Sequence, residues 1–176
     1  MAAPENEFGE LVRVDPIVVR GSQAAVKVGP ITGFASGFQI SLVLLTREQD
    51  PFNDPFGQRA MAQLAAKGGD LPDDLFRVGV QYPDGRKATS LDHLSRMIDR
   101  AKDFDWEAEP SEPVMVPSGG GGGGRWQMDY WVWPVPPVSG DLNMVIEWPA
   151  KGIELTQAAI PASAVVAACE ASKPVW

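Results

Sequence analysis

The sequence predicts a mainly β protein: a single antiparallel β-sandwich of Greek-key or immunoglobulin-like type with one or two short helices, including one at the C-terminus. Three observations support this prediction. Several short segments alternate apolar and polar residues, turn-forming residues separate those segments, and no regular strand-helix repeat is present. A length of 176 residues favours one domain over residues 1–176 with one hydrophobic core.

Strands are predicted through the first quarter of the chain. β-branched residues are frequent in residues 11–14 and 17–19, which Asp15-Pro16 separates, and a third strand over 24–28 follows the break at Gly21-Ser22. The next segment carries its apolar side chains on one face, as in a half-buried strand: Phe38, Ile40, Leu42 and Leu44.

The middle of the chain mixes element types. Residues 58–67 are good helix formers behind a capping signal, and Gly68-Gly69 ends that predicted helix. Alternation over residues 76–82 and the turn Pro83-Asp84-Gly85 predict a hairpin. Residues 90–101 are predicted as a short helix or an acidic loop. The Pro/Gly-rich composition of about residues 107–124 favours a long exposed loop inside the domain.

Two strands are predicted in the last third, over residues 125–133 and 141–148, and a hairpin is expected to join them through residues 134–140. Each strand has one apolar face, and these faces are the predicted core: Trp126, Met128, Tyr130 and Val132 in the first strand, and Leu142, Met144, Ile146 and Trp148 in the second. A last strand is expected around residues 153–156. Pro161 then marks the start of a C-terminal helix that would bury Cys169.

Composition limits the classes of partner. Fifteen basic and twenty-three acidic residues give a formal charge of −8, which opposes binding to nucleic acid or to an anionic membrane surface. Cys169 is the single cysteine, so no internal disulfide can form. The acidic start of the chain lacks the features of an export signal, and no apolar run approaches the roughly 20 residues of a membrane span. We therefore expect a cytoplasmic location.

Catalytic and metal motifs find little support. The glycine run 119–124 matches a G-x-G-x-x-G pattern trivially, but a predicted strand follows it where a nucleotide-binding loop needs a helix. His93 is the single histidine, and no serine sits in a G-x-S-x-G elbow. One histidine and one cysteine cannot form a nitrogen and sulfur zinc site. We expect no cofactor and no metal, and we favour a non-enzymatic role over catalysis.

The second face of strand 125–133 carries the candidate site: Arg125, Gln127, Asp129, Trp131 and Trp133. A hairpin centred near Val138 would place Asp129 opposite Glu147, Trp131 opposite Val145, and Trp133 opposite Asn143. Paired carboxylates beside a tryptophan shelf suit sugar binding or glycoside hydrolysis, in which one acid stays protonated and the other ionised. Asp129 and Glu147 are therefore the candidate catalytic pair.

Three function classes stay open. The favoured one is a binding module that contacts a partner protein, or a second copy of the chain, through the aromatic strand and the glycine-rich loop. Its predicted binding residues are Arg125, Gln127, Trp131, Trp133 and Asn143, because exposed tryptophans are common at binding hot spots. The alternatives are a carbohydrate-binding protein or glycoside hydrolase using Asp129 and Glu147 beside Trp131, and plain structural packing. Burial of Trp131 in the monomer would count against the first class.

One resemblance extends over most of the chain. The glycine run followed by RWQMDYWVWPVPP, with Glu147-Trp148-Pro149 after it and residues 40–44 before it, resembles a family of small uncharacterised proteins from GC-rich bacteria. The resemblance implies a self-contained domain. It implies no activity, cofactor or catalytic residue.

Overall fold

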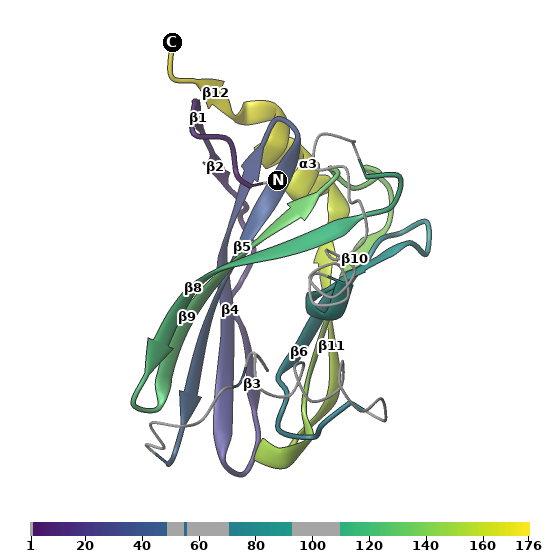
Figure 1. Ribbon diagram of the computed structural model, residues 1–176. Coiled ribbons are helices and arrows are strands. Elements are labelled where there is room, and N and C mark those ends of the chain that lie inside the picture. The colour runs from purple at the N-terminus through teal and green to yellow at the C-terminus, as the bar shows by residue number, and fades with distance from the viewer. Residues whose placement is uncertain (1, 49–54, 56–70, 93–109) are drawn as a thin grey trace, which may run out of the picture.

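The computed structural model describes residues 2–48, 55, 71–92 and 110–176 (Figure 1). Figure 1 shows two layers of strands, with β4, β5, β8 and β9 in one layer and β6, β10 and β11 in the other. All strand pairs are antiparallel. The predicted mainly β, antiparallel sandwich is confirmed.

The larger sheet has the order β2-β4-β5-β9-β8, with β3 also paired to β4. Its strands are β2 (Glu10–Leu11), β3 (Ile17–Arg20), β4 (Ala24–Phe34), β5 (Gly37–Thr46), β8 (Val114–Gly122) and β9 (Arg125–Trp133). The smaller sheet has the order β11-β10-β6-β7. Its strands are β6 (Arg77–Gln81), β7 (Lys87–Thr89), β10 (Asp141–Trp148) and β11 (Ile153–Pro161), and the 3-10 helix η1 (Pro149–Lys151) joins the last two.

The core lies between the two sheets. All eight side chains predicted as core on strands 125–133 and 141–148 are buried. Trp148 is fully buried, packs edge-on against Phe76 with ring centroids 5.6 Å apart, and donates its indole N–H to the carbonyl of Asp74 at 2.9 Å. Burying an aromatic side chain of this size contributes about 1.5–3 kcal/mol to folding.

The C-terminal helix closes one end of the sandwich. Helix α3 (Ala162–Ala171) begins directly after Pro161, as predicted, and buries Ala162, Val165, Ala168 and Cys169. Its backbone runs so close to β4 that a Cβ on Gly33 would lie 2.6 Å from the amide nitrogen of Cys169. The short pair β1 (Glu7–Phe8) and β12 (Lys173–Pro174) lies beyond it at the same end (Figure 1).

Three expectations need correction. Strands β9 and β10 do not form a hairpin, because β9 pairs with β5 and β8 while β10 pairs with β6 and β11. The segment predicted as a loop over about 107–124 is a strand, β8, from residue 114 to 122. The last strand, predicted around 153–156, extends to Pro161.

Two helix predictions fall partly or wholly outside the described residues. The predicted helix 58–67 lies entirely outside them. Of the segment 90–101, residues 90–92 are helical and the remainder lies outside.

Candidate functional site

The glycine run is the turn and part of one arm of a hairpin. Residues 119–122 belong to β8, while Gly123 and Gly124 have φ angles of 61° and 87°. Two successive residues with positive φ make a type I′ turn, whose twist matches that of the flanking strands. The sequence therefore uses glycine here to build a tight β8–β9 hairpin.

Strand β8 is an edge of the larger sheet. Among the residues that the structure describes, it pairs with β9 alone, and β7 of the smaller sheet approaches it without pairing. The residues that flank a two-residue turn form a hydrogen-bonded pair, here Gly122 and Arg125. Alternation along the strand then directs the N–H and C=O groups of Gly119 and Gly121 away from β9. Pro117, which has no N–H to donate, falls in the same outward set.

Residues 118–122 of β8 are exposed and carry almost no side chains; we call them the β8 edge. A Cβ built on Gly120 or Gly122 meets no atom within 4 Å. The sequence did not predict this edge strand, because a glycine run has the composition of a loop. A signal was present in the absence of any charged residue between Glu112 and Arg125, which is unusual for an exposed segment.

The outer face of β9 begins with two exposed polar side chains, Arg125 and Gln127. Asp129 follows and is half-buried, and its Oδ1 accepts a 2.5 Å hydrogen bond from the Ser41 hydroxyl of β5. The face ends with Trp133, which is also half-buried. The structure thus brings Arg125, Gln127 and Asp129 onto one face, as predicted.

Trp131 lies on this outer face but is only 4% exposed. Its ring meets Phe34 edge-on, with centroids 5.7 Å apart, and packs over Gly37, where a Cβ would lie 2.7 Å from the indole. The indole nitrogen is buried and has no hydrogen-bond partner among the residues that the structure describes. The prediction that Trp131 is an exposed binding anchor is therefore wrong, because the β4–β5 turn covers the ring.

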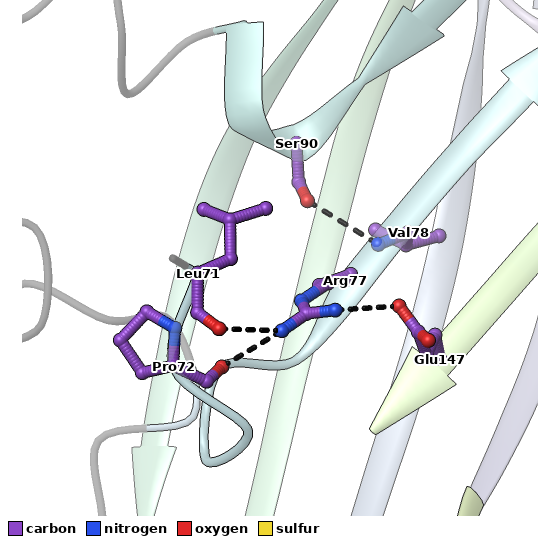
Figure 2. A network of polar contacts seen from close by, with 6 residues as sticks. All are labelled: Leu71, Pro72, Arg77, Val78, Ser90 and Glu147. Carbon is purple, nitrogen blue, oxygen red and sulfur yellow. Dashed lines mark hydrogen bonds and ion pairs between the residues drawn. The ribbon is translucent and has the colours of Figure 1, made fainter. Parts of the chain in front are cut away.

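The proposed carboxylate pair is not assembled. Asp129 lies opposite Ser41 and Ser118 in the larger sheet, and Glu147 lies opposite Arg77 in the smaller one. Figure 2 shows the Glu147 carboxylate accepting a 2.8 Å hydrogen bond from Arg77. Because the two acids lie on the outward faces of opposite layers, they cannot act on one glycosidic bond. The prediction that Asp129 and Glu147 form the catalytic pair of a glycoside hydrolase is therefore wrong.

Asn143 is also separated from the tryptophans. It lies on β10 opposite Gln81 and Ala159, whereas Trp133 pairs with Val114 of β8. The predicted proximity of Asn143 to Trp133 is wrong for the same reason as the carboxylate pair. Of the five predicted binding residues, Arg125 and Gln127 remain exposed beside the β8 edge.

The titratable groups with strongly shifted pKa values are buried structural residues. Burial raises the pKa of the Cys169 thiol to about 11, and burial also raises the pKa of the Tyr82 and Tyr130 hydroxyls. These shifts keep each group protonated and poorly reactive. The described residues contain no group of three histidine, cysteine or acidic side chains placed to hold a metal ion.

Comparisons with known proteins add no assignment. No family model, curated protein or solved structure matches this chain. Within the described ranges, no helix has the length and apolar character needed to cross a bilayer.

Proposed function

We propose that this chain is a non-enzymatic binding module that accepts an extended segment of a partner protein as an additional strand on the β8 edge. The observation that supports this proposal is the outward direction of the backbone groups of Gly119 and Gly121 on an exposed edge strand. Strand addition obtains its affinity from main-chain hydrogen bonds to such groups.

The absence of side chains makes this edge unusually accessible. Natural sheets protect exposed edges with charged side chains, proline or bulges, because unpaired backbone groups attract other strands. The β8 edge has no charged residue, and its register with β9 is continuous over residues 114–122. Pro117 protects only the first half of β8 against pairing with another strand. An incoming segment would therefore pair with residues 118–122.

A matched pair of variants tests this proposal. Gly120→Lys places a charged side chain on the edge in open space, while Gln127→Lys adds the same charge one strand further in, directly opposite Gly120. The probe is a displayed library of unstructured nine-residue segments, selected on the wild-type chain. We expect selected segments to bind wild type and the Gln127→Lys variant, and to bind the Gly120→Lys variant at least tenfold more weakly.

Amide hydrogen exchange locates the contact. A bound segment should slow exchange at Gly119 and Gly121, because their N–H groups become hydrogen-bonded donors. Selection of no segment, or equal binding by the Gly120→Lys variant, would contradict strand addition. Sedimentation of the chain without a segment separates partner binding from pairing of two copies through the same edge.

A further inference from the structure

The outward face of the smaller sheet contains a groove that the proposed function does not use. The groove has a volume of about 330 Å³. Gly79 of β6 lies at its floor, between Val145 of β10 and Thr89 of β7. A glycine inside a strand leaves a hollow on the sheet surface, because its neighbours project and it does not.

One end of the groove is closed by a neutralised cation. Arg77 donates from one terminal nitrogen to Glu147 at 2.8 Å and from the other to the carbonyls of Leu71 and Pro72 at 3.1 and 3.0 Å (Figure 2). Both terminal nitrogens of the guanidinium are therefore engaged by the protein. Arg77 shapes this wall and supplies no free charge to a ligand.

The opposite end carries polar side chains that no described residue engages. Lys87 lies opposite Gln81 at this end, and its ammonium forms no ion pair within the described part of the chain. The Gln81 side chain lines the groove beside Lys87 and likewise makes no hydrogen bond to described residues. Gln157 lines the groove from β11, opposite Val145 and three strands away from Lys87. The Lys87 end thus offers one positive charge and one amide to a bound molecule.

The remaining walls are apolar. Leu71, Val145 and Leu155 line the groove, and the side chains of Leu71 and Leu155 are 37% and 59% exposed. An apolar ligand that covers exposed leucines beside a concave surface removes apolar area from water, which favours binding. The groove is thus apolar along its walls, electrically neutral at one end and positive at the other.

We infer that this groove binds a small amphipathic carboxylate, with its apolar chain against Val145 and Leu155 and its carboxylate beside Lys87. At about 30 Å³ for each water-sized group, the groove has room for a ligand of about ten non-hydrogen atoms. A carboxylate accepts hydrogen bonds from both Lys87 and Gln81, whereas an ammonium ligand would be repelled by Lys87.

Three eight-carbon probes with different head groups test the assignment: octanoate, octanol and octylamine. Methyl NMR spectra of the full chain report binding directly at Leu71, Val145 and Leu155. We expect saturable shifts of these methyls with affinity in the order octanoate, octanol, octylamine. Absence of saturable shifts with octanoate, or binding of octylamine as tight as that of octanoate, would overturn the proposal.

Surface variants separate the charge from the apolar contact without disturbing the core. Lys87→Gln should weaken the binding of octanoate about three- to fivefold, because a partly exposed ion pair contributes modestly to affinity. The affinity for octanol should stay unchanged. Lys27→Gln removes the same charge from the larger sheet and should change neither affinity. Leu155→Asn should weaken octanoate binding further without adding a charge, and Leu45→Asn is its matched control. Equal effects of a variant and its control would refute the site.

Discussion

The Ser41 hydroxyl of β5 donates a 2.5 Å hydrogen bond to the Asp129 carboxylate of β9, its directly opposite neighbour. This bond joins two central strands of the larger sheet on the outward face. It also gives the half-buried Asp129 carboxylate a structural partner within the larger sheet. Asp129 therefore needs no second acid beside it to explain its position.

Replacing Ser41 should therefore destabilise the fold. Ser41→Ala removes the donor and is expected to lower the free energy of unfolding by about 1–2 kcal/mol, because a hydrogen bond to a charged acceptor is stronger than a neutral one. Urea unfolding of Ser41→Ala, Asp129→Ala and the double variant measures the coupling. Additive effects of the two single changes would mean that the bond contributes nothing.

The contact between Gly37 and Trp131 supports a second prediction. Gly37→Ala would place a methyl group against the backbone carbonyl oxygen of Val132 and 2.7 Å from the Trp131 indole, so that β5, β9 or the indole must shift. We expect a loss of about 1–3 kcal/mol in the free energy of unfolding, typical of overpacking. Gly120→Ala is the matched control, because its added methyl meets open space and any effect of alanine on the unfolded chain is shared.

Unfolding followed by tryptophan fluorescence checks this pair. The Gly120→Ala variant should unfold within about 0.5 kcal/mol of wild type. Equal stability of the two variants would show that Gly37 is not packed tightly against Val132 and Trp131 of β9.

Period-two patterning predicted which side chains lie inside, and it did so correctly for both strands 125–133 and 141–148. The same pattern carries no information on strand partners. A strand paired in either sheet shows the same alternation, so the register that opposed Asp129 to Glu147 rested on chain proximity alone. The connection after Trp133 instead passes from one sheet to the other.

Two other predictions were wrong: the loop at residues 119–122 and the exposure of Trp131. Both depend on neighbours that are distant in the sequence. Residues 119–122 form a strand because β9 pairs with them, although glycine alone favours a flexible segment. Trp131 points outward as predicted, yet Phe34 and Gly37 cover it. Neither covering residue could be identified before the strand order was known.

A third prediction concerns the connection between the sheets. The Tyr82 hydroxyl donates a 2.7 Å hydrogen bond to the carbonyl of Pro134, the residue that follows β9. Tyr82→Phe should lower the free energy of unfolding by about 1–2 kcal/mol, because it leaves a carbonyl without its donor. Tyr130→Phe removes a hydroxyl that bonds to no described residue and should have a smaller effect. A reversed order in thermal unfolding would contradict this role for Tyr82.

The fourth prediction follows from the buried thiol of Cys169. Burial raises its pKa from an ordinary value of 9.0 to about 11 in the folded chain. Between these two values the unfolded chain has lost the thiol proton and the folded chain has kept it, so unfolding releases a proton. Stability therefore falls as pH rises from about 9 to 11, and this contribution is constant below that window.

Comparison with Cys169→Ala isolates this contribution from those of Tyr82 and Tyr130, whose pKa values are also raised. The difference in unfolding free energy between wild type and the variant should be constant from pH 7 to 8 and should shrink between pH 9 and 11. The thiol should also react with iodoacetamide far more slowly in the folded chain than in urea at pH 8, because the thiolate is the reacting form. Parallel stability curves through pH 11, or rapid alkylation of the folded chain, would place Cys169 in contact with water instead of on the buried face of α3.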